Sequence, residues 1–351
     1  MKTYKHLYPE VCSFQNLLRA YRKARRGKRL KPAVAEFDID LEKNLFQLRA
    51  ELRRMMYEPG EYRDFIVHEP KERLISAAPF RDRVVHHAVC NVIEPIFERS
   101  FIFDSYACRK GKGTHKAIER CQSFLMRNRY VLKCDVRKFF PSIDHEVLLA
   151  LVQRKIADVD LLVLLEKVIR SKVFREEIEY LDLLDMFNHE VRYKGIPIGN
   201  LTSQFFANVY LNGLDQFMKH GLRTRYYIRY MDDFLVFSDD KAYLHWVKER
   251  AREYLRSLKL EMHPKKCTVF PTATGVDFLG FRLYRSYRRI RKSNIKLFIR
   301  RLKRMRWLYG RGEMELDKIG QSVQSWVAHA RHAKSDGLRT SLFNRFSFVR
   351  G

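Results

Sequence analysis

The sequence lacks long apolar runs, and its few cysteines follow no recognisable pattern. None of its hydrophobic stretches approaches the ~18 residues that a membrane-spanning helix needs. The opening stretch MKTYKHLYPEVCSFQ has no signal-peptide core. The six cysteines are scattered and form no Cys-x-x-Cys pair, which argues against a disulfide framework or a zinc knuckle. These absences predict a protein of a reducing cytoplasm.

Acidic residues are scarce relative to basic ones. The 351 residues include 69 Lys plus Arg against 41 Asp plus Glu, a formal net charge of +28. This excess is more than solubility requires and indicates a polyanionic partner, with nucleic acid the leading candidate. An anionic membrane surface is the weaker alternative, because no exposed amphipathic aromatic helix is evident. We therefore predict no membrane association.

Helical and strand-like periods alternate along the chain, without repeats or low-complexity tracts. Two early stretches, 13–29 and 40–56, are amphipathic and predict helices. Two strand-like runs follow around a basic turn, and later helices, one capped by Asp144 and one over 202–220, alternate with strands that end in antiparallel hairpins. This order favours an α+β or mixed α/β core. We divide the chain into a basic helical N-terminal extension, a central domain and a basic helical C-terminal part, with predicted bounds 1–60, 61–284 and 285–351.

The C-terminal part contains a long basic stretch without acidic residues. From Phe278 to Gly312 there are thirteen Lys or Arg and no acidic residue. Apolar residues recur at helical spacing between Ile295 and Met305, so one face should pack while the others present charge. A merely solvated helix usually carries both signs, so we predict nucleic-acid contact by the cations of this helix: Lys296, Arg300, Arg301, Lys303 and Arg304.

An acidic pair interrupts an apolar run in IRYMDDFLVF, residues 228–237. Strands disfavour Asp, and a buried unpaired carboxylate costs on the order of several kcal/mol. We expect two short strands joined by a tight turn at Met231 and Asp232. Either the turn merely happens to be acidic, or Asp232 and Asp233 are held together to bind metal.

A third carboxylate favours the metal interpretation. Asp135 closes another apolar strand, residues 130–136. Strand-end acids that converge can hold two Mg²⁺ ions roughly 4 Å apart, and hard oxygen ligands are those that Mg²⁺ prefers.

The motifs in this region resemble those of reverse transcriptases. YMDDF after DVRKFFPSI is similar to the palm motifs, and further motifs follow the family order over residues 60–285. The resemblance implies a right-hand polymerase with fingers, palm and thumb, two Mg²⁺ ions with Mn²⁺ as a substitute, and dNTPs, template RNA and cDNA as partners. The other matching stretches are 70–89, 106–118, 195–211, 260–267 and 276–281.

The resemblance also implies roles for individual residues. Asp135, Asp232 and Asp233 match the catalytic triad, with the carbonyl of Val136 as a further metal ligand. Phe140 matches the residue that blocks a ribose 2′-hydroxyl, with a core aromatic as the alternative. The remaining matches are to nucleotide-binding positions: Arg73, Arg81, Ile198, Gly199, Gln204 and Lys266.

Three of these assignments leave alternatives open. Arg81 could instead form a structural salt bridge with Asp82 or another acid. Lys266, which matches a lysine that protonates pyrophosphate, could lie in an exposed turn. His329 and His332 have the spacing of a metal pair, but no further ligand accompanies them, so we expect no metal there.

One departure from the common pattern points to a subfamily. Many relatives carry Gln-Gly-x-x-x-Ser-Pro beneath the templating pair, whereas this chain has IGNLTSQ, with Ile198 for Gln and Gln204 for Pro. This run resembles the reverse transcriptases of diversity-generating retroelements. The resemblance implies copying of a template-repeat RNA into adenine-mutagenised cDNA, together with an oligomeric accessory variability determinant protein.

Other identities stay open. The retron motifs Asn-Ala-x-x-His and Val-Thr-Gly are absent, and we expect no maturase, endonuclease or RNase H domain after the thumb. A non-mutagenic retron-like or abortive-infection reverse transcriptase would keep the same palm. A non-catalytic RNA-binding scaffold would be expected to have lost acids of the triad.

Overall fold

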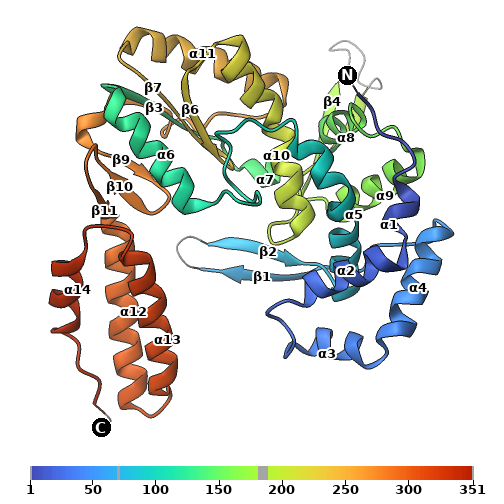
Figure 1. Ribbon diagram of the computed structural model, residues 1–351, viewed down its shortest axis with the longest axis horizontal. Coiled ribbons are helices and arrows are strands. Elements are labelled where there is room, and N and C mark those ends of the chain that lie inside the picture. Colours follow the sequence, from blue (N-terminus) through green and yellow to red (C-terminus); the bar gives the residue numbers. More distant parts are fainter. Residues whose placement is uncertain (1, 69–71, 181–188, 350–351) are drawn as a thin grey trace. The chain divides into compact units, whose positions relative to one another are not determined.

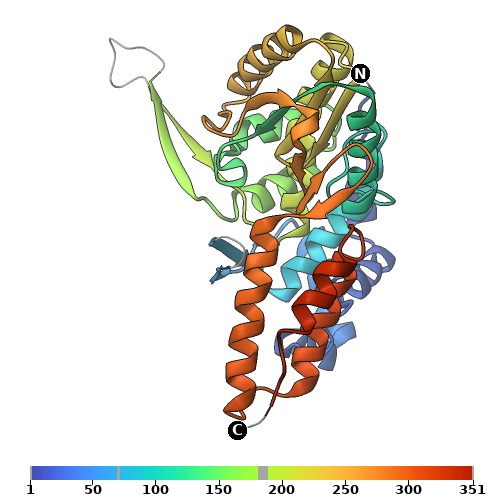
Figure 2. The ribbon, with the colours of Figure 1, turned by 90° about the vertical axis from the view of Figure 1, so that its left-hand side faces the viewer.

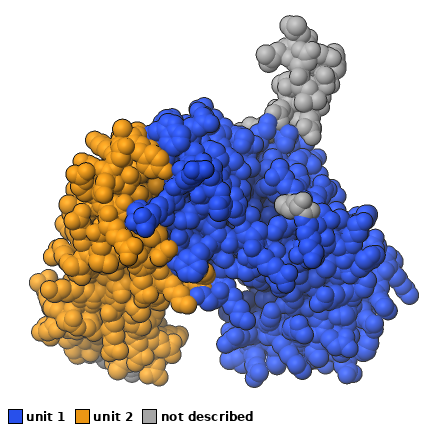
Figure 3. Space-filling model, turned by 45° about the horizontal axis from the view of Figure 1, so that its top comes forward, with its two compact units in different colours: residues 1–111, 133–235, 246–268 blue, residues 112–132, 236–245, 269–351 orange. Residues whose placement is uncertain are grey.

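The computed structural model describes residues 2–68, 72–180 and 189–349 (Figure 1). The chain forms two compact units, each assembled from three stretches and coloured separately in Figure 3. The first unit contains residues 1–111, 133–235 and 246–268, and the second contains 112–132, 236–245 and 269–351.

The N-terminal region of the first unit is helical, as predicted. Ser13 caps the second helix by accepting a hydrogen bond from the Asn16 amide at 3.2 Å, which satisfies one of the free N–H groups of its first turn. Leu17 and Ala20 of that helix are buried, and the helix packs against α5 (Phe80–Glu98). The N-terminal helices are α1 (Tyr8–Val11), α2 (Phe14–Arg25), α3 (Pro32–Ile39) and α4 (Leu41–Arg53).

Two predicted strands precede α5 and pair with each other. β1 (Arg63–Val67) and β2 (Arg73–Ala77) are antiparallel, with Phe65 opposite Ile75. The basic turn predicted between them includes residues 69–71, which lie outside the described residues. This hairpin brings Arg73 to the start of β2.

A four-stranded sheet carries the predicted acidic strand ends. Its order is β6-β7-β3-β8, so the strand that ends on Asp135 lies next to the strand that begins with Asp233. Val131, Leu132, Phe234 and Leu235 are fully buried. The strands are β3 (Tyr130–Asp135), β6 (Tyr226–Tyr230), β7 (Asp233–Ser238) and β8 (Thr268–Pro271).

Most of the central part of the chain outside the sheet is helical. Asp144 caps α8, as predicted, by accepting from the Val147 amide at 3.0 Å. The predicted helix over 202–220 is α10, followed by a short π-helical turn. The helices are α6 (Thr114–Arg127), α7 (Phe139–Ser142), α8 (His145–Gln153), α9 (Val159–Arg170), α10 (Leu201–Gln216), η1 (Phe217–Gly221) and α11 (Lys241–Ser257).

One hairpin was not predicted. β4 (Arg175–Tyr180) and β5 (His189–Lys194) pair antiparallel, with Arg175 opposite Lys194, and extend as a two-stranded ribbon (Figure 2). The strand sequences REEIEY and HEVRYK are dominated by charged residues. Strands made largely of charged residues lack the apolar alternation by which a strand is recognised in a sequence.

The C-terminal part of the second unit contains a small sheet and a helical bundle. β10 lies between β9 and β11, and Phe281 pairs with both Phe278 and Ile290. In the bundle, Phe298 stacks on Trp326 with ring centroids 4.1 Å apart. The elements are η2 (Thr272–Thr274), β9 (Val276–Phe278), β10 (Phe281–Leu283), β11 (Arg288–Ile290), α12 (Lys292–Gly310), α13 (Leu316–Ala330) and α14 (Asp336–Phe343).

No helix within the described ranges is both long enough and apolar enough to cross a membrane.

Candidate active site

The acidic pair lies at a tight turn between β6 and β7. Met231 occupies the left-handed region, with φ of 57°, which a side chain with a Cβ adopts only under strain. Asp232 completes the turn and Asp233 begins β7. The turn predicted from the sequence is thus confirmed, and it places two carboxylates side by side in the chain.

The third carboxylate is held against this turn by the backbone. The Val136 amide donates to the Asp232 carbonyl at 3.2 Å, which ties the end of β3 to the turn. On its other side, the carbonyl of Asp135 accepts from the His263 amide at 2.8 Å. The two predicted strand ends therefore meet, as the metal interpretation requires.

Burial disfavours the charged forms of Asp232 and Asp233. It raises the pKa of the Asp233 carboxyl to about 7; the ammonium of Lys133, 3.5 Å away, opposes this shift, and the charges of Asp232 and Asp135 add to it. Burial also raises the pKa of Asp232, with a further contribution from the charge of Asp135. Carboxylates that are buried together in this way are stabilised by a nearby cation.

The donor set fits a divalent cation in its chemistry. Three carboxylates gather at the strand ends, and the buried Oδ1 of Asp233 accepts no hydrogen bond among the described residues. Oxygen ligands of this kind suit Mg²⁺. In the described part of the chain no group of three His, Cys, Asp or Glu side chains is arranged to enclose an ion, and Oδ2 of Asp135 accepts from the Lys266 ammonium. An ion at Asp135 would compete with Lys266.

Two predicted phosphate-binding cations lie near the carboxylates. Arg73 is exposed at the start of β2, and its charge partly opposes the rise that burial causes in the pKa of Asp232. Lys266 does the same in addition to pairing with Asp135. Lys266 is therefore a neighbour of the acids and does not simply project from an exposed turn.

The contacts of Arg81 bear on the alternative to its triphosphate assignment. It forms a salt bridge with Glu51 of α4, donates to the carbonyl of Glu58 at 3.3 Å, and lies over the ring of Tyr57 with its guanidinium 5.1 Å from the centroid. Asp82, the partner considered in the sequence, is 3.9 Å away. These contacts favour the structural salt bridge, because they join α5 to the N-terminal helices.

The segment with the unusual isoleucine contacts β2. The Ser76 amide donates to the carbonyl of Ile198 at 3.1 Å. Gly199 has a φ of 120°, and a Cβ there would lie 3.0 Å from Cγ2 of Ile75, so both conformation and space favour glycine. Gln204 follows in the first turn of α10, partly exposed. These contacts fix Ile198 to the strand that carries Arg73.

Phe139 and Phe140 are adjacent in the chain but differ in burial. Phe139 is buried and makes an edge contact with Tyr210, their ring centroids 6.4 Å apart. Phe140 is only partly buried, and its carbonyl accepts from the Ile196 amide at 3.0 Å. The core position therefore belongs to Phe139, which disfavours the core alternative for Phe140.

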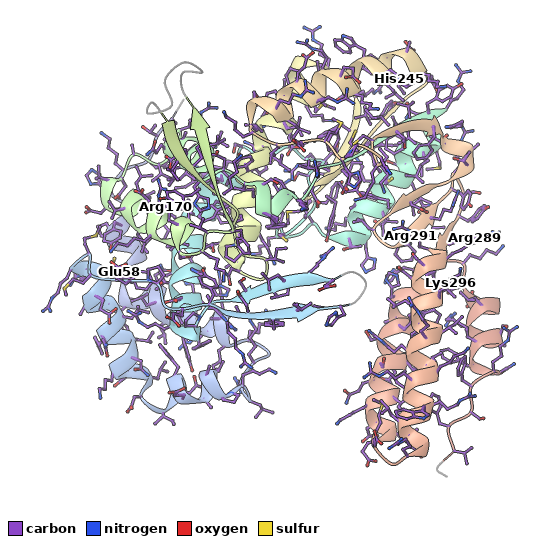
Figure 4. All side chains as sticks on the ribbon, turned by 180° about the vertical axis from the view of Figure 1, so that it is seen from behind. Glu58, Arg170, His245, Arg289, Arg291 and Lys296 are labelled. Atoms are coloured by element: carbon purple, nitrogen blue, oxygen red, sulfur yellow. The ribbon has the colours of Figure 1, made fainter. Side chains whose placement is uncertain are left out.

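The basic helix of the second unit is α12. Phe298, Leu302 and Met305 are buried, as the spacing predicts, and Ile295 is partly buried. Figure 4 shows Lys296 near the beginning of the helix, with Arg289 and Arg291 just before it. The five cations predicted to contact nucleic acid are all exposed: Lys296, Arg300, Arg301, Lys303 and Arg304.

Both histidines of the C-terminal pair, His329 and His332, pack against other rings. His332 stacks on His115 with ring centroids 3.7 Å apart, and His329 lies 4.5 Å from Phe281 by the same measure. Burial lowers the pKa of both His329 and His332, and neighbouring histidines add to the shift. These contacts explain the i, i+3 spacing without a metal.

The sequence did not reveal two contacts that shape the site. Lys133 lies 3.5 Å from Asp233, and Arg229 of β6 donates to the carbonyl of Met231 at 2.9 Å. Arg229 is fully buried and pairs with Asp215 of α10. An arginine in the middle of an apolar strand was the available signal, because such a charge needs a buried partner.

Comparison with known proteins agrees with this geometry. A family described as reverse transcriptase (RNA-dependent DNA polymerase) matches residues 67–283, more than half of the chain. The chain belongs to the reverse transcriptase family. The predicted right-hand polymerase fold is thereby confirmed, as is the assignment to RNA-directed DNA polymerases.

Individual relatives show how far the similarity extends. Protein YkfC of Escherichia coli K12 is 27% identical over 278 residues, 68% of this reverse transcriptase and 70% of YkfC. The group II intron-encoded protein LtrA of Lactococcus lactis subsp. cremoris is 22% identical, over 72% of this chain and 51% of LtrA. A structure of apo telomerase from Candida tropicalis has a TM-score of 0.48 and 11% identity, over 66% of this chain and 55% of that one. The reverse transcriptase spans about half the length of LtrA.

Proposed function

We propose that this reverse transcriptase serves a diversity-generating retroelement in the cytoplasm. It would copy a template-repeat RNA into cDNA that is mutated at adenines, together with an accessory variability determinant protein. The observation that carries this proposal is Ile198, which replaces the family's usual glutamine and is fixed to β2 by its backbone.

The chemistry of position 198 explains why its identity matters. A glutamine side chain both donates and accepts hydrogen bonds and could help to fix the incoming nucleotide, whereas isoleucine does neither. A net hydrogen bond contributes about 0.5–1.5 kcal/mol, roughly three- to tenfold in discrimination. Ile198 alone is therefore insufficient for frequent misincorporation. Arg73, on the neighbouring strand, is our second contributor, through its hold on the triphosphate.

We assign the other site residues as follows. Asp135, Asp232 and Asp233, with the carbonyl of Val136, would hold two Mg²⁺ ions or Mn²⁺ in their place. Bound there, the ions would activate the primer 3′-hydroxyl and neutralise the triphosphate. Arg73 would bind the triphosphate through its guanidinium fork, and Lys266 would protonate the leaving pyrophosphate.

The test is the fidelity of cDNA synthesis on one RNA, with the accessory protein present. We expect Ile198→Gln to lower misincorporation opposite template adenines by roughly three- to tenfold while the rate of synthesis stays close to normal. Deep sequencing of the cDNA measures misincorporation, and the amount of cDNA formed with time measures the rate. Val191→Gln is the matched control, because Val191 is an exposed apolar residue on β5.

The main alternative is a non-mutagenic bacterial reverse transcriptase of the retron-like or abortive-infection type. The family match is compatible with it, because that match covers the polymerase motifs of this chain, within residues 67–283. Wild-type protein that copies adenines as faithfully as other bases would favour this alternative and contradict the mutagenic proposal. Protein that binds RNA but incorporates no dNTP would favour the third possibility, a non-catalytic scaffold.

A further inference from the structure

A basic pocket opens in the first unit two residues beyond Asp135. Its volume is about 350 Å³. Four cationic side chains line it against a single carboxylate, so it carries a clear positive excess. The lining residues are Arg137, Lys138, Pro141, Ser142, Lys194, Lys259 and Glu261.

The same backbone that positions Asp135 builds this pocket. The Arg137 amide donates to the carbonyl of Glu261 at 2.8 Å, and the His263 amide donates to that of Asp135, also at 2.8 Å. These bonds lie on either side of the bridge between Val136 and Met262. The pocket lining and the candidate active site therefore share two paired backbone segments.

Two lysines of the pocket have a backbone conformation that is strained for lysine. Lys138 and Lys259 have φ angles of 44° and 55°, in the left-handed region that glycine and asparagine adopt more readily. Lys259 follows the end of α11, where a positive charge also suits the helix dipole. Lys138 precedes α7, so the helix dipole does not favour a positive charge at this position. Strain of this kind is typical of functional positions.

The lining of the pocket contains one ion pair between its own residues. Arg137 pairs with Glu261 at 2.9 Å, but their side chains remain 53% and 70% exposed, so water screens the pair. Three lysines line the same cavity. A chain of net charge +28 has cations on many surfaces; this group differs because it is concave and adjoins the catalytic strand end.

We propose that this pocket binds the polyphosphate of a free nucleotide, either the triphosphate of an arriving dNTP or the pyrophosphate released by synthesis. Phosphate oxygens accept the charge-assisted hydrogen bonds that lysine and arginine donate. The volume lies at the lower end of the ~300–1,000 Å³ typical of small-molecule sites, which favours a compact anion over a nucleic-acid strand. The proposal rests on polymerisation at Asp135, Asp232 and Asp233.

Steady-state kinetics test the proposal with a variant designed to fold. Lys138→Asn with Lys259→Asn removes two charges but keeps residues that tolerate the left-handed conformation. We expect the KM for dNTP in synthesis, and for pyrophosphate in the reverse reaction, to rise about tenfold. The control is Arg250→Gln with Arg252→Gln on α11, which removes the same charge from residues paired with Glu253 and Glu249.

A binding measurement separates the pocket from the catalytic acids. Inorganic pyrophosphate is titrated into full-length Asp232→Asn, Asp233→Asn protein without RNA. We expect binding to persist, and to weaken about tenfold when the two lysine substitutions are added. Persistence in protein that makes no cDNA would support the pocket whatever becomes of the retroelement proposal.

Two outcomes would overturn the polyphosphate assignment. If the lysine variant leaves both KM values at those of the control but flattens the salt dependence of RNA binding, the pocket holds strand phosphates instead. If the variant matches the control in every measurement, pyrophosphate titration included, the cations are a solvated surface.

Discussion

Arg229 and Asp215 form a fully buried ion pair next to the turn that carries the acidic residues. Nε and Nη2 of Arg229 donate to the two carboxylate oxygens of Asp215, each at 2.7 Å. Nη1 donates to the carbonyl of Met231 at 2.9 Å. Arg229 thus stabilises the left-handed conformation of Met231, and Asp215 of α10 fixes the position of Arg229.

Asp215→Ala should destabilise the protein strongly, because it leaves Arg229 buried without a counter-charge. Removing one partner of such a pair typically costs about 3–5 kcal/mol in the free energy of unfolding. Urea denaturation measures the loss. Asp104→Ala is a comparison, since Asp104 pairs with Lys219 at the longer distance of 3.4 Å and should matter less.

Replacing both partners should separate stability from positioning. Asp215→Leu with Arg229→Met removes the buried charges together, which is often close to neutral for stability. The carbonyl of Met231 then loses its donor, so we expect kcat to stay low and the Mg²⁺ dependence to shift to higher concentrations. Full recovery of kcat would show that the pair serves the core alone.

The carboxylates themselves should be indispensable for synthesis. Asp232→Ala with Asp233→Ala should lower the rate of dNTP incorporation by at least about a thousandfold, because metal-held charge supplies several kcal/mol of transition-state stabilisation. RNA affinity should remain, since both acids repel phosphate. Substantial incorporation by this variant on a primed RNA would refute the assignment of the triad.

Much of this arrangement was accessible from the sequence, because it depends on local patterns. Apolar periodicity predicted α2 and α4, an N-cap predicted the start of α8 at Asp144, and the MDD stretch predicted the turn. Each of these signals is contained within a few residues of chain.

The remainder depends on partners that are distant in the sequence. Arg81 pairs with Glu51, thirty positions earlier, and no local pattern selects that acid among the others. Lys133 meets Asp233 only because β3 and β7 are neighbours in the sheet. The hairpin β4–β5 was missed because its charged strands carry no apolar alternation.

Stability should depend on pH through a buried histidine. Burial lowers the pKa of His86 to about 3, against 6.5 when it is exposed. The unfolded chain therefore binds more protons between these values, so His86 costs no stability above about pH 6.5 and progressively more as the pH falls toward 3. We expect His86 to lower the unfolding free energy by about 2 kcal/mol between pH 7 and pH 5.

His86→Leu should flatten this dependence, as measured by urea denaturation at several pH values. The matched control is His245→Leu, since His245 is exposed on α11 (Figure 4). A pH profile that is the same for His86→Leu and wild type would assign the acid sensitivity to other groups, of which His87 is the first to test because its pKa is also lowered by burial, to about 4.

The exposed cations of α12 should contribute to RNA binding through phosphate contacts. Changing Arg300, Arg301, Lys303 and Arg304 to Gln should weaken binding about equally for all sequences. Each lost contact removes roughly 0.7–0.9 from the slope of log K against log salt, so the slope should fall by about 3. The control removes four cations from α11: Lys241, Arg250, Arg252 and Arg256. An unchanged slope would indicate that α12 faces a protein partner.

The last prediction concerns the choice of sugar at Phe140. Because Phe139 fills the core and Phe140 is only partly buried, shortening Phe140 should open space without collapsing the fold. If its ring occupies the position of a ribose 2′-hydroxyl, Phe140→Ala should raise the ratio of rNTP to dNTP incorporation by roughly 10–100-fold, since a steric rejection of this size is lost with the ring. Single-nucleotide incorporation with each substrate measures the ratio. Phe139→Leu is the control: it should lower the unfolding free energy by about 1 kcal/mol while leaving the ratio unchanged. A Phe140→Ala protein that loses stability to the same degree and keeps its preference for dNTPs would return Phe140 to the core.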